Sequence, residues 1–357
     1  KVGGHTENGK TTFEKKLWYD AESGQLMKGK DKWTAETIKL GENYYVDYYV
    51  LEADSYYLSS DISLEHAIRI SGDVNLCLNG CKITSSGNSL GSVIVDTGSF
   101  TLTDCKNGGS IEHADRKSGS GVYMYGSGTT FNMYGGTITK NSISGVCVTQ
   151  TSTFNMYGGK ITGNNHSYGG GVSNGGTFNM YGGEISGNTA SSNGGGVYVD
   201  SYSWVSFKVS GSAKITDNTV NGAANNVYLP SGKTIAIRGL TGGANIGVTT
   251  AEKPTDKKHV TIVSGAGTMS YDNVVKADDS ENYKTQMDGA DLVLAVKNVT
   301  PPAQVHTDHF LCTTGTACTG IGGHSCVETH FGEISTLDDL KRAASSGGNY
   351  YLKNSIV

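Results

Sequence analysis

A segment of closely similar sequence occurs three times in the middle of the chain, and this repeat limits the folds that the chain can adopt. The copies are GTTFNMYGGTITKN (128–141), STFNMYGGKITGN (152–164) and GTFNMYGGEISGN (176–188). Their phenylalanines, Phe131, Phe154 and Phe178, are 23 and 24 residues apart. A period of roughly 20 to 50 residues is typical of solenoids, propellers and other repeat arrays.

Each copy has the pattern of short strands joined by turns. In FNMYGG, Phe and Met alternate with Asn and Tyr, so the apolar pair faces one side of a strand. TIT, TIS and GVYV segments supply two further short strands, and glycine pairs fit turns that need positive φ. Three strands in 23–24 residues are too few for a four-stranded propeller blade, and no long helical stretch occurs. We therefore expect an all-β parallel β-helix with three short strands per coil.

Stacking of such coils predicts columns of identical side chains, because equivalent residues of neighbouring strands lie about 4.8 Å apart. Inside the solenoid we expect a phenylalanine column with methionines beside it, and a ladder of hydrogen-bonded amides at the turns. The residues are Phe131, Phe154 and Phe178, then Met133, Met156 and Met180, then Asn141, Asn164, Asn188 and Asn218.

A second set of columns is expected on the outer face of the same strands. It consists of Tyr134, Tyr157 and Tyr181 with Asn132, Asn155 and Asn179 beside them. An exposed aromatic strip flanked by amides has the chemistry of a glycan-binding surface, with a ring face for sugar CH groups and polar edges for hydroxyls. The alternative is that these cross-strand pairs only stabilise the sheet.

Composition excludes several classes of protein. The chain has 28 Lys+Arg against 33 Asp+Glu, so it has no basic excess with which to bind nucleic acid. No apolar run approaches the roughly 20 residues of a membrane span, and the first residues lack the apolar core of a signal peptide. We expect a soluble fragment from which any targeting signal has been removed. The 51 glycines are accounted for as turn residues of the repeat.

The FNMYGGxIxxN and GGGVYV repeats, with NYYVDYYVLEADSYYLSSDISL (43–64) and VNLCLNGCKI (74–83), resemble a known family. They are similar to the right-handed parallel β-helix repeat proteins on the surfaces of anaerobic, mostly Gram-positive gut bacteria. The resemblance covers roughly Trp33 to Val296 and is strongest in the three central coils. It implies a right-handed β-helix in a secreted or wall-attached multidomain protein. It implies no particular reaction, because β-helices serve enzymes, adhesins and spacers alike.

The pattern divides the chain into four parts. Residues 1–33 lack the repeat and are rich in charge, as in a leader or the tail of a preceding module. Residues 34–298 form the β-helix, which ends in a cap of alternating strands (260–267 and 291–298). Residues 299–334 form a linker rich in Cys and His. Residues 335–357 contain a capping helix (335–345) and a segment similar to residues 53–63, which indicates the start of a second β-helix unit.

Seven cysteines need an explanation. Alignment of coils places Cys81 and Cys105 near the same turn, where a disulfide fits an exported protein. Cys147 is expected to be a free thiol that points outward. Residues 306–330 crowd Cys and His together, and the candidate ligands of a structural zinc ion there are Cys312, Cys318, His324 and Cys326. Their spacing is not that of a C-x2-C knuckle, so a disulfide with one cysteine left over is the alternative.

One segment concentrates the residue types that could cleave glycans. Glu112, His113, Asp115 and Arg116 lie in IEHADRKSG, where one coil is longer than the others. Insertions in solenoids often carry function, although a solvated loop is the simpler interpretation. No acidic triplet recurs at stacked positions.

Together these features predict an extracellular β-helical stalk or adhesin-like module of a bacterial surface protein, which either binds host or dietary glycans or is structural. The alternatives are a glycoside hydrolase or polysaccharide lyase and a purely mechanical spacer. We expect no cofactor apart from the candidate zinc ion, and further domains of the same chain as partners.

Overall fold

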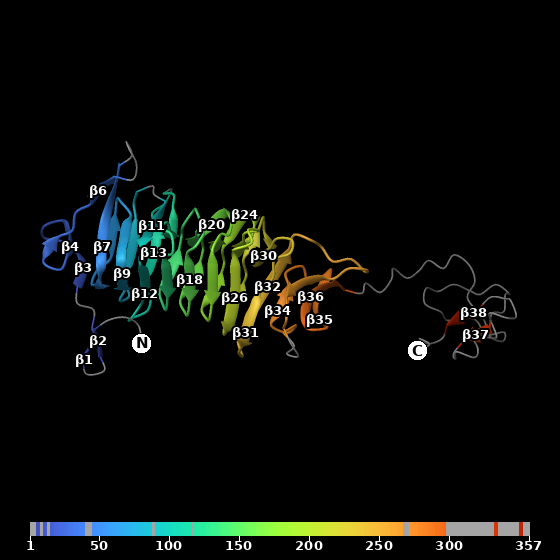
Figure 1. The fold of residues 1–357 in the computed structure, drawn as a ribbon. Coiled ribbons are helices and arrows are strands. Elements are labelled where there is room, and N and C mark those ends of the chain that lie inside the picture. The colour runs from blue at the N-terminus through green and yellow to red at the C-terminus, as the bar shows by residue number, and fades with distance from the viewer. Residues whose placement is uncertain are drawn as a thin grey trace. The chain divides into compact units, whose positions relative to one another are not determined.

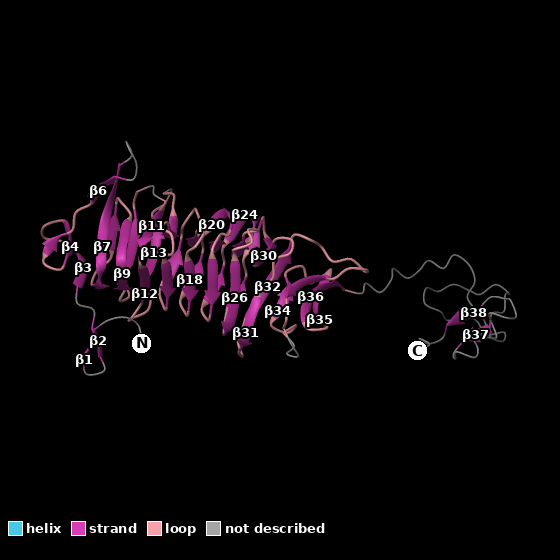
Figure 2. Cartoon of the chain, in the orientation of Figure 1, coloured by secondary structure: helices cyan, strands magenta, loops and turns pink. Residues whose placement is uncertain are grey.

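The computed structural model describes residues 5–7, 10–12, 15–39, 45–87, 90–115, 117–266, 271–297, 332–334 and 350–352. The chain divides into two compact units, 1–297 and 298–357. The first unit is a parallel β-helix of about eight coils with three strands per coil (Figure 1). The described residues contain strands and no helix (Figure 2). The expected all-β solenoid is therefore confirmed.

The strands stack into three parallel faces, named here A, B and C in their order along a coil. Face A contains β12 (Ser99–Thr103), β15 (Thr130–Met133), β18 (Thr153–Met156), β22 (Thr177–Met180), β26 (Ser206–Gly211) and β31 (Ala236–Leu240). Face B contains β8 (Ile62–Leu64), β10 (Lys82–Ser85), β13 (Ser110–His113), β16 (Thr137–Thr139), β19 (Lys160–Thr162), β23 (Glu184–Ser186) and β27 (Lys214–Thr216). Face C contains β11 (Gly91–Thr97), β14 (Ser120–Met124), β17 (Val146–Val148), β21 (Val172–Asn174), β25 (Val197–Val199) and β30 (Val227–Leu229).

Longer strands connect these faces at the ends of the solenoid. β7 (Tyr45–Leu58) and β9 (Ile68–Cys77) pair along face C and then along face A, with a register shift between Glu52 and Asp54. β32 (Asn245–Thr250) pairs first with β27 of face B and then with β30 of face C. β34 (Val275–Ala277) pairs with β32. A small additional sheet lies between faces B and C and contains β20 (Asn165–Tyr168), β24 (Thr189–Asn193), β28 (Thr219–Val220) and β29 (Ala223–Ala224).

The repeat produces this register because identical residues pair between coils. Phe131 pairs with Phe154, and Phe154 pairs with Phe178. The intervening turns are closed by glycines at positive φ, such as Gly159 with φ of 82°. A Cβ at Gly159 would lie 2.8 Å from the backbone oxygen of Gly136, so the close approach of successive turns also requires glycine there.

The predicted phenylalanine column is confirmed and is longer than the repeats alone indicate. Five rings stack through the core, with centroid separations of 5.3, 4.9, 4.8 and 5.1 Å along the series. They are Phe100, Phe131, Phe154, Phe178 and Phe207. Met133, Met156 and Met180 are buried beside them. The core is thus a continuous apolar column rather than a set of separate clusters.

Antiparallel strands lie at both ends of the first unit. At the N-terminal end β3 (Lys15–Asp20) pairs in parallel with β7 and antiparallel with β4 (Gln25–Lys28). β5 (Asp31–Lys32) pairs antiparallel with β4, and β6 (Glu36–Lys39) pairs antiparallel with β7. Leu17 and Trp33 are buried in the common core, so part of the segment expected as a leader packs against the first coil. β1 (His5–Glu7) and β2 (Lys10–Thr12) form a separate hairpin.

At the C-terminal end β33 (Val260–Val263), β36 (Asp291–Val296) and β35 (Tyr283–Asp288) form an antiparallel sheet whose Leu292 and Leu294 are buried. Its strands include the two segments expected to form the cap. In the second unit β37 (Gly332–Ile334) and β38 (Tyr350–Leu352) pair in parallel. The expected helix at 335–345 lies outside the described residues.

Candidate functional site: ladders and columns of the solenoid

The turn after face B carries an unbroken ladder of buried amides, as the repeat predicts. In each step the Nδ2 of one asparagine donates to the Oδ1 of the next, with distances of 2.8, 2.9, 2.9 and 3.0 Å. The members are the four predicted residues, Asn141, Asn164, Asn188 and Asn218, and Asn226, which the repeat did not predict and which lies just before β30 in the same coil as Asn218. The same oxygens also accept from backbone N–H groups, for example from Asn164 to Asn188 Oδ1 at 3.0 Å. The ladder therefore satisfies backbone and side-chain groups together.

Titratable groups that the repeat pattern did not reveal lie at the two ends of this ladder. At one end His113 Nδ1 lies 2.8 Å from Asn141 Oδ1, and since that oxygen is an acceptor, Nδ1 carries the proton. At the other end the carboxylate of Asp278 accepts from Asn226 N at 2.7 Å and from Thr249 Oγ1 at 2.8 Å. Burial lowers the pKa of His113, and the hydrogen bond to Asn141 partly offsets this lowering. Burial raises the pKa of Asp278.

Of the four residues proposed for glycan cleavage, the three that the structure describes do not share one surface. Glu112 and His113 are neighbours in β13, so their side chains point to opposite faces of the strand, and His113 belongs to the buried ladder. The Glu112 carboxylate lies 3.7 Å from Lys140 Nζ. Asp115 is exposed in the following turn, and Arg116 lies outside the described residues. Among the described residues of this group, Glu112 forms an ion pair and His113 ends the amide ladder, and no two carboxylates face each other.

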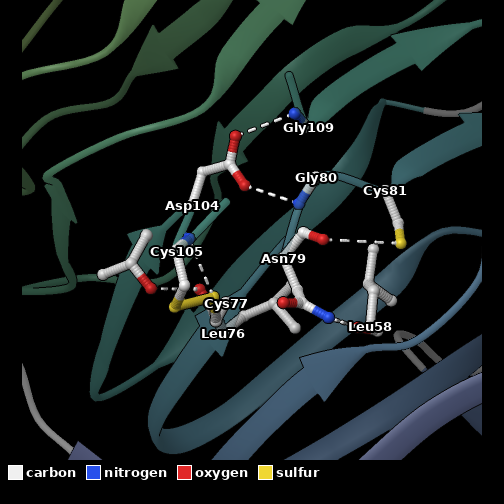
Figure 3. The surroundings of a disulfide bond; sticks show 10 residues. Leu58, Leu76, Cys77, Asn79, Gly80, Cys81, Asp104, Cys105 and Gly109 are labelled. Carbon is white, nitrogen blue, oxygen red and sulfur yellow. Dashed lines mark hydrogen bonds between the residues drawn. A yellow bond between two sulfur atoms is a disulfide. The ribbon is translucent and has the colours of Figure 1, made fainter. Parts of the chain in front are cut away.

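The extra length of this coil lies partly before β13. Phe100 is in register with Phe131, and Ile111 is in register with Ile138. Ile111 follows Phe100 by 11 residues, whereas Ile138 follows Phe131 by only seven. The additional residues form the turn at 104–109. In it Asp104 accepts from the backbone N–H groups of Gly80 at 2.7 Å and Gly109 at 2.8 Å (Figure 3). Asp104 thus fixes the turn.

The same turn corrects the expected disulfide. Cys105 is bonded to Cys77, with a Cα–Cα distance of 6.3 Å, and Cys81 is a free thiol (Figure 3). The pairing Cys81–Cys105 is wrong because Thr103 is in register with Cys77, which places Cys105 just beyond it. Cys81 lies farther along its own coil, where its backbone oxygen accepts from Ser110 N at 3.2 Å.

Cys147 is free and lies in β17 between Tyr123 and Ser173 of the adjacent coils, as the repeat predicts. Burial raises its pKa to about 11, so little thiolate is present at neutral pH. The four candidate zinc ligands, Cys312, Cys318, His324 and Cys326, lie outside the described residues. Within the part that the structure describes, no cluster of three or more potential metal ligands occurs.

The outer tyrosine column on face A is confirmed. Tyr134, Tyr157 and Tyr181 stack with centroid separations of 4.5 and 4.8 Å and interplanar angles of 9°, and each is 40% to 43% exposed. Because each ring covers the face of the next, the column presents mainly its edges and hydroxyl groups to solvent. Burial raises the pKa of Tyr157, and the two flanking tyrosines add to this shift.

The amides beside this column are also hydrogen-bonded from coil to coil. Asn155 Nδ2 donates to Asn132 Oδ1 at 3.0 Å, and Asn179 Nδ2 donates to Asn155 Oδ1 at 2.9 Å. The expected strip of tyrosines and amides therefore exists as one ordered surface, and its role in binding glycans stays a prediction.

No helix among the described residues is long and apolar enough to cross a membrane. Comparisons with protein-family models, with curated proteins and with solved structures find no match for this chain.

Proposed function

We propose that the first unit is a rigid stalk of an exported bacterial protein of the β-helix repeat type, which holds other parts of the molecule away from a surface. The observation that carries this proposal is the unbroken amide ladder from His113 to Asp278, which runs beside a continuous phenylalanine column. Each coil is bonded to its neighbours by backbone, amide and aromatic contacts, so no coil in this series offers a hinge. The Cys77–Cys105 disulfide supports an oxidising compartment.

Hydrogen–deuterium exchange of the full chain tests this rigidity. A stalk without hinges requires that the strand amides between β13 and β30 exchange slowly, and that no inner coil exchanges faster than the coils on both sides of it. Exchange resolved by peptide mass spectrometry measures this. If one coil in this series opened on its own within seconds, the solenoid would contain a hinge, and the proposal of a rigid stalk would fail.

A second candidate function is glycan binding by the outer strip of face A. The observation that favours it is the regular exposure of three tyrosine hydroxyls at intervals of one coil, beside a ladder of amides. Such a surface offers donors and acceptors at a fixed spacing to a polymer of hydroxylated units.

The triple variant Tyr134→Ala, Tyr157→Ala and Tyr181→Ala tests the second candidate. If the strip binds glycans, retention of the protein on a glycan array falls at least tenfold in the triple variant. The matched control is Tyr19→Ala, which removes a tyrosine of similar exposure, 48%, from the N-terminal end of the unit. Unchanged retention in the triple variant excludes the strip as the binding surface.

A further inference from the structure

The row of turns between faces C and A contains a notch. The turn between β17 and β18 has four residues (149–152), the next, between β21 and β22, has only Gly175 and Gly176, and the one between β25 and β26 has six (200–205). A Cβ at Gly176 would lie 2.4 Å from the backbone oxygen of Thr149, so this short turn requires glycine. The floor of the notch therefore carries no side chains.

A shallow, open cavity of about 340 Å³ occupies this notch at the surface, lined by Gln150, Gly175, Asp200, Tyr202 and Trp204. This volume lies at the lower end of the range for small-molecule sites, roughly 300 to 1,000 Å³. Gln150 comes from the turn on one side, and Asp200, Tyr202 and Trp204 come from the longer turn on the other. The cavity is thus built by three successive coils.

The two aromatic rings of the cavity are exposed but held in place. Tyr202 and Trp204 are 54% and 47% exposed and stack with a centroid separation of 4.6 Å and an interplanar angle of 6°. Trp204 Nε1 donates to the backbone oxygen of Gly175 at 3.2 Å, and Lys233 Nζ donates to Val205 O at 3.1 Å, which ties down the end of the turn. Each ring covers one face of the other, so the pair presents one outer face of each ring together with the ring edges. An exposed aromatic group whose orientation is fixed in this way favours ligand binding.

Polar groups complete the cavity. Asp200 Oδ1 accepts from the backbone N–H of Ser201 at 2.6 Å, whereas Oδ2 has no hydrogen bond to the residues that the structure describes. The Gln150 amide is exposed and makes no hydrogen bond within the described part of the chain. The site therefore combines an aromatic platform with one carboxylate acceptor and one amide that both donates and accepts.

We propose that this notch binds a single pyranose unit of a glycan. The sugar's CH face would lie against the uncovered outer face of one ring of the Tyr202–Trp204 stack, with its hydroxyl groups donating to Asp200 and exchanging hydrogen bonds with Gln150. A quaternary ammonium ligand fits less well, because such ligands are bound within cages of aromatic faces set at angles to one another, and these two rings are parallel. The site is separate from the tyrosine strip of face A, and the stalk proposal does not depend on it.

Saturation-transfer NMR on the full chain tests the proposal with methyl pyranosides of glucose, galactose, mannose and N-acetylglucosamine at millimolar concentration, with choline in a parallel arm. We expect transfer to the ring protons of at least one pyranoside. Trp204→Ala and Asp200→Ala should each weaken its binding at least tenfold, and Tyr19→Ala, which removes an exposed tyrosine that lines neither the notch nor the strip of face A, should leave it unchanged. Because Trp204 and Asp200 are at the surface, circular dichroism should show that both variants fold.

Three results would overturn the proposal: no transfer to any pyranoside, transfer to choline alone, or equal pyranoside binding by wild type and the folded Trp204→Ala variant. Loss of binding in the triple tyrosine variant with retention in Trp204→Ala would instead move the site to face A.

Discussion

Replacement of Asn188 by alanine is expected to lower the free energy of unfolding by about 3–4 kcal/mol. Asn188 is fully buried in the middle of the ladder. Its Oδ1 accepts from both the N–H and the Nδ2 of Asn164, at 3.0 and 2.9 Å, and its Nδ2 donates to Asn218 Oδ1 and Ile161 O, both at 2.9 Å. Removal of the amide leaves several of these buried groups without a partner and out of reach of water, and each such group costs about 1–3 kcal/mol.

The matched control for this prediction is Asn179→Ala in the same coil. Asn179 belongs to the outer amide ladder, where its Nδ2 donates to Asn155 Oδ1 at 2.9 Å beside solvent. Water can replace that bond, so we expect a loss of only about 0.5–1 kcal/mol. Denaturant unfolding followed by circular dichroism measures both variants. Asn188→Leu keeps a side chain of similar size at this position but removes its hydrogen bonds. If this variant were as stable as wild type, packing rather than the amide ladder would explain the role of Asn188.

The fold could be predicted from the sequence because one repeat determines both the period and the direction of each side chain. Phe131 and Met133 alternate with Asn132 and Tyr134, and this order alone assigns the inner and outer columns. A coil with the wrong register would turn every one of these residues to the other face, so the pattern permits one arrangement.

The ends of the ladder could not be predicted in the same way, since they do not repeat. His113 ends the ladder although its register aligns it with Lys140, one residue before Asn141, and its neighbours Glu112 and Asp115 give it the appearance of a catalytic cluster. Asp278 directly follows β34 and lies 52 residues beyond its partner Asn226, in a region without the repeat. Their roles follow only from contacts between coils, which sequence spacing does not contain.

The disulfide and the notch depend on turn length, which the repeat leaves free. Thr103 is in register with Cys77, and the longer turn at 104–109 places Cys105 next to Cys77 rather than Cys81. A two-residue turn at Gly175 opens a cavity beside Trp204, although the sequence there shows only another glycine pair. Turn lengths in a solenoid vary without cost to the core, so they create the features that differ from coil to coil.

Phe154→Ala is expected to lower the free energy of unfolding by about 3–5 kcal/mol. Phe154 is fully buried between Phe131 and Phe178, at centroid separations of 4.9 and 4.8 Å and interplanar angles of 8° and 6°. Its removal leaves a cavity the size of a ring in a core that the strands on either side hold open. Denaturant unfolding followed by circular dichroism measures the effect.

The same coil supplies a control in which the stacking is alike and the burial differs. Tyr157 also stacks between two rings, at 4.5 and 4.8 Å with angles of 9°, but it is 40% exposed. Tyr157→Ala removes an aromatic stack of nearly the same geometry without opening an internal cavity, so we expect a loss of about 1 kcal/mol or less. The difference between the two variants measures what burial adds to stacking. Equal losses would mean that ring stacking, and not the dry core, holds successive coils together.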